Sequence, residues 1–527
     1  MKSSGSPALA AQLPLIHALR TRLPGTDAEH PARLIETHIS WVLLAGGFAY
    51  KIKKAVDLGF VDFTTLELRR HYCEEELRLN RRLAPELYLD VMGIGDVENW
   101  GQTPILKLGS DPNFEAIEYA VRMLEFPQEA LASHVLQRGD LRPDHIDALA
   151  AQIADFHQHI AVAPLGGDYG SPATVEATML QNFDVIEPLA EDDAERAEIA
   201  ALRAWTAAGG KWGQTPISKQ RGSAPIFLLV AQRRQSGFVR ECHGDLHLGN
   251  MVLLDDRLVI FDCIEFNPRL RWIDVISEVA FVVMDLVDRG APQLAHRFLN
   301  AYLERSGDYA GLALLPLYRC YRAMVRAKVA RLRIVQMPPG AERDDELLEY
   351  RGYLDLARKF TEPPQPLLLI THGLSGSGKS TVTQGLLETM GAVRLRTDVE
   401  RKRMFAVGVE QERMFGDEAQ LGRSTTSDDA EVARIAGGTY TAESGLYSSD
   451  ATRQTYEHVA GLARDVLRAG FVCIVDAAFL KRWQRDRFRA LAGELNVPFA
   501  IVSFTASEAT LRGRVAARAR KASDVSD

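Results

Sequence analysis

The chain has 527 residues, of which 46% are hydrophobic and 25% charged, and its formal net charge at pH 7 is −8. This length exceeds what one hydrophobic core usually serves, so we expect roughly two to four domains. The composition is that of an ordinary globular protein, and the acidic balance provides no overall basic field for nucleic acid.

Cysteine usage and the N-terminus bear on location. The 5 cysteines are widely scattered and form no CxxC pair, so neither a disulfide framework nor a zinc site is supported. The first 20 residues lack a long apolar core, and no apolar stretch approaches the roughly 20 residues that span a bilayer. The run at 281–288 contains charge and is interpreted as a buried helix. We expect a soluble, cytoplasmic protein with reduced thiols and no membrane partner.

The first elements along the chain predict a small β-rich lobe. Residues 37–63 are rich in β-branched and aromatic residues, and Gly46-Gly47 between two apolar runs predicts a hairpin. A helix is predicted over about 65–83, because apolar residues recur there at helical spacing. Residues 116–126 are interpreted as a further strand that leads into a connector.

The chain after Pro127 is mostly helical up to about Phe360, with short apolar strands such as NMVLLD and RLVIFD between the helices. A small β-rich part followed by a larger helical part indicates one bilobal domain. We predict this domain over 1–360, with a small lobe at about 30–126 and a large lobe at about 127–360.

A short internal repeat interrupts this pattern. Residues 100–114 and 212–227 both begin with WGQTPI and are near-copies in otherwise unrelated surroundings. Their Gly, Pro, Ser and Asn content suits surface loops, which tolerate insertion. Two insertions of a mobile coding element explain them, and a shared binding loop is the alternative.

Residues 361–366, TEPPQP, form the clearest linker, because prolines there cannot continue the preceding helix. From 367 to 527 apolar strands alternate with helical stretches, which is typical of a parallel α/β sheet. The predicted fold is an α+β bilobal domain followed by an α/β domain with a parallel sheet.

Residues 242–266 contain the most complete catalytic pattern. His243, Asp245 and Asn250 have the spacing H-x-D-x-x-x-x-N of a kinase catalytic loop, and Asp262 ends a strand 12 residues after Asn250. In that chemistry Asp245 accepts the proton of a substrate hydroxyl, while Asn250 and Asp262 bind Mg²⁺. The two acids bracket a predicted hairpin, which brings the proton acceptor and the metal ligands together.

A lysine for the phosphates of ATP belongs on an early strand of such a domain. FAYK, residues 48–51, matches the V-A-I-K pattern and predicts Lys51 for this role, although Lys53 lies on the same face. Its partner is expected on the following helix, where Glu76 competes with the two glutamates before it. We choose Glu76, because apolar residues follow it at helical spacing.

The second chemical motif is GLSGSGKS, residues 373–380, which fits the phosphate-binding pattern GxxxxGK[ST] completely and lies between an apolar strand and a helix. The glycines let backbone N–H groups turn toward phosphate, Lys379 reaches the β- and γ-phosphates, and Ser380 Oγ binds Mg²⁺. The sequence therefore predicts an ATP and Mg²⁺ site. Its predicted nucleotide-binding residues are Gly373, Ser375, Gly376, Ser377, Gly378, Lys379, Ser380 and Thr381.

Later residues complete this second predicted site. Asp398 follows a short strand, where it can accept the proton of an attacking hydroxyl; a surface turn is the alternative. Asp476 ends a buried strand and resembles the acid that orients Mg²⁺ or its water. Arg514 and Arg518 share one helix face and could close over the phosphates, or form a solvated basic face instead.

These motifs resemble two families. The pattern in 242–266 is similar to the aminoglycoside phosphotransferase and choline kinase group, a branch of the protein-kinase-like fold, over roughly 30–350. The loop over the phosphates departs from the kinase pattern, because only Gly46-Gly47 precedes Lys51 and no G-x-G-x-x-G does.

The C-terminal part resembles the small-molecule P-loop kinases, such as gluconate kinase, chloramphenicol phosphotransferase and zeta toxin, over roughly 366–520. The chain stops soon after Arg518, so the nucleotide-base pocket of this P-loop NTPase domain is expected to be shortened. The order of the two parts is similar to that of bacterial proteins called bifunctional aminoglycoside phosphotransferase/ATP-binding protein.

Three further features have plainer interpretations. Asp274 is predicted to cap a helix, or else to support the catalytic loop. Residues 318–333 form a basic helix, which is either a solvated face or a wall of the substrate cleft. His157 is interpreted as a packed helix residue rather than a metal ligand.

The leading functional hypothesis is a two-site ATP-dependent phosphotransferase that moves the γ-phosphate of ATP to hydroxyls of small-molecule substrates. A nucleotide-binding regulator or toxin-like ATPase with one active kinase site is the first alternative. A nucleic-acid end kinase is the second, and the acidic composition and the lack of a recognisable RNA module weigh against it. The sequence leaves the substrates, the coupling of the sites and the oligomeric state open.

Overall fold

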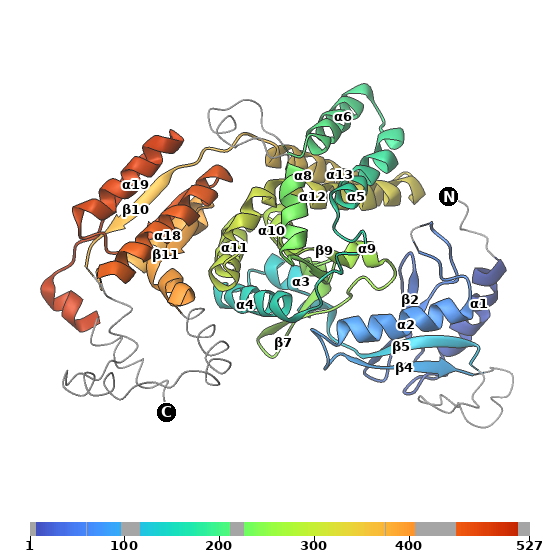
Figure 1. The fold of residues 1–527 in the computed structure, drawn as a ribbon. Helices are drawn as coiled ribbons and strands as arrows, with labels where there is room; N and C mark the ends of the chain where they lie inside the picture. Colours follow the sequence, from blue (N-terminus) through green and yellow to red (C-terminus); the bar gives the residue numbers. More distant parts are fainter. Residues whose placement is uncertain are drawn as a thin grey trace, which may run out of the picture. The chain divides into compact units, whose positions relative to one another are not determined.

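The chain divides into two compact units in the computed structural model, which describes residues 7–59, 61–95, 116–210, 226–374, 376–405 and 449–514. The first unit contains 1–207, 225–290 and 321–356. The second draws on residues 291–320 as well as on the described residues from 357 onward (Figure 1). The two WGQTPI repeats fall almost entirely outside the described residues, so their interpretation stays a prediction.

The small lobe of the first unit is an antiparallel sheet with strand order β1-β2-β3-β5-β4. The predicted hairpin joins β2 to β3, and Gly46 and Gly47 both have positive φ, of 58° and 79°. A two-residue turn with both φ values positive matches the twist of the flanking strands, which explains the two glycines. Its elements are α1 (Pro7–Leu19), β1 (Arg33–Glu36), β2 (Ser40–Ala45), β3 (Phe48–Lys53), α2 (Leu66–Asn80), β4 (Tyr88–Ile94) and β5 (Glu118–Leu124).

Both faces of this sheet are covered. Leu43 and Tyr50 lie on the face packed against Ile16 and Leu19 of α1. Neighbouring strand residues point to the opposite face, where Cys73 of α2 joins a second cluster. Helix α2 lies along β4 and β5 on that side (Figure 1). The charged side chains that α2 and β3 direct at each other therefore become buried.

The large lobe is mostly helical, as predicted, with one short hairpin, β7–β8, and one antiparallel pair of strands, β6 and β9, that are separated in the sequence. Helix α10 contains the run 281–288 and is buried along nearly its whole length. Its N-cap is Asp274, whose side chain accepts a hydrogen bond from the backbone N–H of Ile276, so the capping prediction is confirmed. The elements of this lobe are η1 (Gln128–Ala130), α3 (Ala132–Gln137), α4 (Pro143–His159), α5 (Pro172–Ile186), η2 (Glu187–Leu189), α6 (Asp193–Ala207), α8 (Ile226–Gln235), β6 (Val239–Glu241), η3 (Leu248–Asn250), β7 (Met251–Leu254), β8 (Arg257–Ile260), α9 (Pro268–Arg271), β9 (Trp272–Asp274), α10 (Val275–Asp288), α12 (Leu315–Gln336) and α13 (Ala341–Phe360).

The second unit contains a parallel sheet with strand order β11-β12-β10-β13, which confirms the predicted α/β fold. Helices α18 and α19 contact each other and the sheet (Figure 1). Helix α11 packs against α14, although the two are far apart in the sequence. Its elements are α11 (Pro292–Ser306), η4 (Tyr309–Ala313), β10 (Leu368–His372), α14 (Lys379–Met390), β11 (Val393–Arg396), α18 (Ser449–Arg468), β12 (Cys473–Asp476), α19 (Arg482–Leu495) and β13 (Phe499–Ser503).

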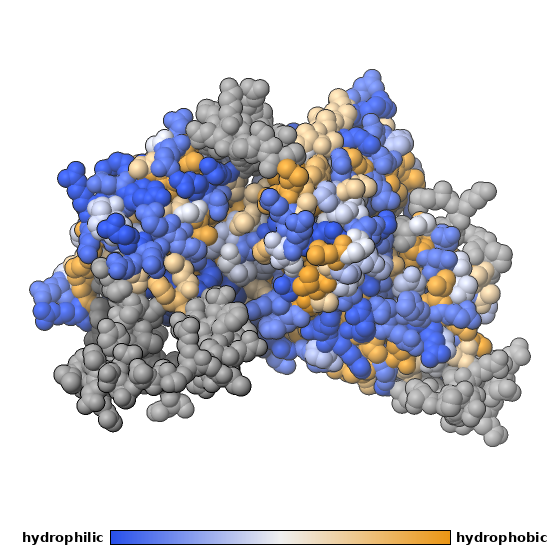
Figure 2. Space-filling view, in the orientation of Figure 1, coloured by the Kyte–Doolittle hydropathy of each residue, from blue (hydrophilic) through white to orange (hydrophobic). Residues whose placement is uncertain are grey.

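Neither the described helices nor the visible surface suggests a membrane span. Among the described helices, none combines the length and the apolar character needed to cross a bilayer. In the view of Figure 2, hydrophilic residues cover most of the coloured surface, and hydrophobic residues gather in small separate patches. All five cysteines are buried, and none of them forms a disulfide.

Candidate active sites

Asp245, in the loop after β6, and Asp262, after β8, lie on either side of the β7–β8 hairpin, as the sequence predicted. The Asn250 Nδ2 donates to Asp245 Oδ2 at 3.0 Å, and the Nε2 of His247 lies 3.5 Å from the same oxygen. Burial acts to raise the pKa of Asp245, but the charges of His247 and other neighbours outweigh it, so the pKa lies below its usual range. Asp245 is therefore an ionised carboxylate at neutral pH, able to accept a proton.

Glycine is required next to this carboxylate. Gly244 has φ of 90°, and a Cβ at this position would lie 2.7 Å from the carbonyl oxygen of Leu270. A side chain would both strain the backbone and push the loop away from its neighbour. The H-G-D sequence thus reflects a close backbone approach as well as the chemistry of Asp245.

Buried carboxylates of α10 hold the backbone of the catalytic loop. The N–H of Gly244 donates to Glu278 at 2.7 Å, and the N–H of Leu248 donates to Asp285 at 2.8 Å. Residues seven apart share one face of a helix, so Glu278 and Asp285 of α10 bind the catalytic loop at two points. His157 bonds the other oxygen of Glu278 at 2.8 Å, in keeping with its interpretation as a packed residue.

The basic helix at 318–333 also reaches this loop. Arg322 of α12 is buried, and its guanidinium donates to the carbonyl of Gly244 at 3.0 Å and to the backbone of Ser277. The interpretation of this helix as a solvated face is therefore wrong for Arg322. A buried cation with carbonyl partners reinforces the loop from a second side.

Asp262 meets the small lobe through Lys51. Its carboxylate lies 2.5 Å from Lys51 Nζ, and Lys51 in turn lies 2.8 Å from Glu76 Oε1. Burial acts to lower the pKa of Lys51, but the charges of Asp262 and Glu76 raise it well above the usual value. The structure thus brings together Lys51, Glu76 and Asp262, the set that the sequence placed on three separate elements.

The second lysine of β3 shares the same glutamate. Lys53 Nζ bonds Glu76 Oε2 at 2.8 Å and also contacts Glu265. Lys53 and Glu76 are 1% and 0% exposed, whereas the Lys51 side chain is 14% exposed. Burial would raise the pKa of Glu76, but the two lysines lower it to about 2. Lys51, but not Lys53, retains access to solvent, which favours Lys51 as the predicted phosphate lysine.

The phosphate loop of the second unit has the backbone that its glycines predicted. Gly376 and Gly378 have positive φ, and a Cβ on Gly373 would lie 2.5 Å from the carbonyl of Phe504. Lys379 begins α14 and donates to the carbonyls of Gly373 and Leu374 at 3.0 and 2.8 Å. The Lys379 side chain thus lies across the loop that is predicted to bind the phosphates together with it.

Three polar side chains at this loop are consistent with binding of a nucleotide and its metal ion. Ser380 Oγ donates to Asp476 Oδ2 at 2.9 Å, so the predicted Mg²⁺ ligands of α14 and β12 adjoin each other. Ser377 Oγ is buried and has no hydrogen-bond partner among the described residues. An unsatisfied buried hydroxyl is rare in folded proteins and is consistent with a missing polar ligand.

The remaining residues of this predicted site are placed unequally. Asp398 is exposed in the first turn of the helix after β11, and the last residue of β11 pairs in register with Asp476, so both acids lie at one end of the sheet. Arg514 donates to the carbonyl of Gly376 at 3.1 Å, which brings it to the phosphate loop. Ser375 and Arg518 lie outside the described residues, and Thr381 is exposed.

Comparison with known proteins gives two family matches. Residues 73–315 match the model of a family described as phosphotransferase enzymes, and residues 368–527 match that of an AAA domain. The chain thus joins a phosphotransferase-family part to a P-loop part. With these matches, it is an ATP-dependent phosphotransferase by class.

The chain is also similar to individual proteins. An uncharacterised protein of Mycobacterium tuberculosis is 29% identical over 510 residues, which cover 95% of this chain and 90% of the relative. A choline/ethanolamine kinase family protein from Mesorhizobium loti has 12% identity and a TM-score of 0.39 over 67% of this chain and 96% of that one. A choline kinase from Cryptosporidium parvum has 10% identity and a TM-score of 0.39 over 66% and 96%.

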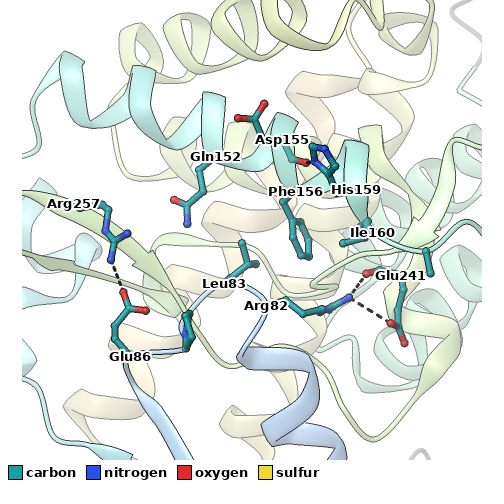
Figure 3. Close-up of a pocket in the computed structure, with 12 residues that line it drawn as sticks. Arg82, Leu83, Glu86, Gln152, Asp155, Phe156, His159, Ile160, Glu241 and Arg257 are labelled. Atoms are coloured by element: carbon teal, nitrogen blue, oxygen red, sulfur yellow. Dashed lines mark hydrogen bonds and ion pairs between the residues drawn. The ribbon is translucent and has the colours of Figure 1, made fainter. Parts of the chain in front are cut away.

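A separate cleft lies on the phosphotransferase part. It has a volume of about 760 Å³ and is formed by the segment after α2, by α4 and by the β7–β8 hairpin. Its charged side chains are already paired, since Arg257 contacts Glu86 and Arg82 contacts Glu241 (Figure 3). The cleft is lined neither by Asp245 nor by Lys51 and Asp262, so it is distinct from the candidate active site.

Several residues of the phosphotransferase site escaped sequence reasoning. Glu278 and Asp285 could have been found as two carboxylates seven apart in an apolar helix, because acids are costly to bury without partners. His247 lies two residues after Asp245, and no local signal marks it. Glu265 follows Asp262 by three residues, but only the fold shows that it meets Lys53.

Proposed function

We propose that the chain is a two-site phosphotransferase that moves the γ-phosphate of ATP to hydroxyls of small-molecule substrates. The observation that carries the proposal is that each unit assembles its own phosphate lysine beside acidic residues. Lys51 lies beside Asp262 in the first unit, and in the second Ser380 bonds Asp476 next to Lys379. Five buried cysteines without a disulfide are consistent with a cytoplasmic location, where thiols remain reduced.

In the first site Asp245 accepts the proton of the substrate hydroxyl, and Asn250 orients that carboxylate. Lys51 binds ATP phosphates, with Glu76 holding the lysine in place. Asp262 and Asn250 would hold Mg²⁺, which neutralises phosphate charge when bound. The lysine now paired with Asp262 would turn to the phosphates when nucleotide binds.

In the second site the backbone N–H groups of the phosphate loop and Lys379 bind the phosphates. Ser380 and Asp476 would hold Mg²⁺. Asp398 is the proposed proton acceptor, and Arg514, already at the loop, offsets charge that develops on the transferred group. Arg518 is proposed to assist it. Glycerol-like, sugar, amino-alcohol and nucleoside hydroxyls all remain candidate acceptors, to be separated by a ³¹P NMR substrate screen.

Single-site variants test the proposal. Asp245→Ala should lower phosphotransfer at the first site about 10²–10⁴-fold, the range for loss of a general base, and Lys379→Ala should abolish it only at the second. Asp345→Ala and Lys359→Ala, both exposed on α13, are matched controls that should leave both activities unchanged. If Asp245→Ala leaves all kinase activity intact while Lys379→Ala removes it, the first unit is a nucleotide-binding regulator and the two-site proposal is wrong.

A further inference from the structure

Helix α11 and η4 belong structurally with the P-loop sheet, although they lie within the stretch that matches the phosphotransferase family. The family match extends to residue 315, whereas residues 291–320 group with the second unit. Pro292 begins α11 and Gly307, with φ of 75°, ends it. A Cβ on Gly307 would lie 3.1 Å from Arg403 of the P-loop part, so the two segments approach closely.

Polar contacts connect α11 to α14, the helix that follows the phosphate loop, and to β11, the next strand along the chain. Toward the C-terminal end of α14, His296 bonds the carbonyl of Glu388 at 2.7 Å, and Arg297 pairs with the Glu388 carboxylate at 2.7 Å. On β11, the N–H of Arg394 donates to Asn300 at 2.7 Å. These are directed, partly buried bonds rather than incidental surface contacts.

Glu304 is the centre of this interface. Its Oε1 accepts from the Nε and a terminal nitrogen of Arg394, both at 3.2 Å, and its other oxygen lies 3.6 Å from Arg396. Arg394 is 6% exposed, so its charge needs a partner in the interior. The Glu304 side chain, 16% exposed, supplies that partner from α11.

Arg394 also contacts the end of the phosphate loop. Its remaining terminal nitrogen donates to the backbone carbonyl of Ser380 at 3.2 Å. Ser380 is the second residue of α14, and its hydroxyl bonds Asp476 at 2.9 Å. A continuous path of bonds therefore leads from α11 to the pair of residues predicted to bind Mg²⁺.

We infer that Glu304 is a positioning residue of the P-loop site: through Arg394 it holds the first turn of α14, and thereby the Ser380 hydroxyl, in register with Asp476. This inference rests on the proposed function of that site. It implies that residues 367–527 do not contain the whole site, because a segment from the preceding part completes it. Partners that orient metal ligands typically contribute about 10–100-fold to metal affinity.

The test uses the full chain with Lys51→Ala, so that binding of ADP reports on the P-loop site. Calorimetric titration with ADP is compared in the presence and absence of Mg²⁺. Glu304→Gln should reduce the enhancement of ADP affinity by Mg²⁺ about 10-fold or more, with metal-free ADP affinity nearly unchanged. Glu388→Gln is the matched control, because it removes the ion pair between Arg297 of α11 and Glu388 of α14, at the opposite end of α14 from the loop, and should preserve the enhancement.

A second variant separates positioning from simple loss of stability. In Glu304→Gln/Arg394→Met no buried cation is left unpaired, so the Tm should recover, yet the Mg²⁺ enhancement should stay low. Recovery of both quantities in the double variant, or an unchanged enhancement in Glu304→Gln, overturns the inference. If the Lys51→Ala parent binds no ADP at all, or binds it equally well after Lys379→Ala, the proposed P-loop function itself is wrong and the inference falls with it.

Discussion

The two lysines of β3, Lys51 and Lys53, lie on the same face of the strand but have different surroundings. Both contact Glu76, so the glutamate neutralises two cations at once. Lys51 faces Asp262, which is 43% exposed, whereas Lys53 faces Glu265, which is 4% exposed. Exposure therefore separates a lysine that can meet a nucleotide from one that ties the glutamate to the segment after Asp262.

Breaking the buried pair of Lys53 and Glu265 should be costly. Lys53→Met leaves Glu265 buried without its cation and should lower the free energy of unfolding by about 3–5 kcal/mol. Lys53→Met/Glu265→Met should recover most of this loss, since replacing both charges by apolar groups is often neutral. Urea unfolding measures both effects.

The control for this experiment is Glu74→Gln, which breaks an exposed pair with Arg70 on the same helix and should cost less than about 1 kcal/mol. A Lys53→Met protein as stable as the wild type would show that the buried pair contributes nothing. A double variant no more stable than the single one would show that the site needs the charges themselves.

Asp288, at the end of α10, should make stability depend on pH. Asp288 is exposed at the helix end, but partial desolvation by its neighbours and the nearby Asp285 raise its pKa from 3.8 to about 6. A raised pKa in the folded state means that protonation favours folding, so this contribution is complete below pH 3.8 and is lost as pH rises through 6. Asp288→Asn should therefore stabilise the protein at pH 7 more than at pH 4, measured by urea unfolding at both pH values.

At the scale of elements, α2 links local sequence to the phosphotransferase site. Its N-cap is Thr65, whose side chain accepts from the backbone N–H of Leu68, and the same helix carries Glu76. Helix α10 works similarly, because Asp274 caps it and its inner carboxylates hold the catalytic loop. In α2 the cap lies about three turns from Glu76, whereas in α10 Glu278 lies in the first turn, next to the cap.

Removal of the α2 cap should therefore be felt at the site. Thr65→Ala leaves an N–H of the first turn without its acceptor and should cost about 1 kcal/mol of stability. The KM for ATP at the first site should rise as well, because α2 positions Glu76. Thr65→Ser keeps the acceptor oxygen and should behave like the wild type in both thermal unfolding and ATP titration; equal losses in the two variants would contradict a capping role.

At the scale of the whole molecule, two units with separate nucleotide sites should respond separately to ligand. A ligand present at about 100 times its Kd stabilises the unit that binds it by about 2.7 kcal/mol. Scanning calorimetry with Mg²⁺ and ADP should therefore raise the unfolding temperature of both units. Lys379→Ala should abolish the response of the second unit and leave that of the first. A simultaneous loss of both responses would show that the units do not bind nucleotide independently.

Sequence reasoning reached the fold class and the order of the two parts, and both are confirmed by the family matches and the parallel sheet. Its success has a physical reason, because the chemical motifs are local. A phosphate loop needs its glycines, lysine and serine within eight positions, and a catalytic loop needs Asp245 and Asn250 close together on one turn.

The sequence by itself thus determined which local segments carry the phosphate-loop and catalytic-loop patterns, since the spacing of a few residues specifies each pattern, and it predicts phosphate binding and proton acceptance there. Only the tertiary structure decided that Lys51 and Lys53 each pair with one carboxylate oxygen of Glu76. It likewise decided that Glu278 and Asp285 hold the catalytic loop. It also decided that α11 packs with the P-loop sheet, although α11 lies within the stretch that matches the phosphotransferase family. These outcomes depend on burial and on contacts between residues tens to hundreds of positions apart, which no local pattern records.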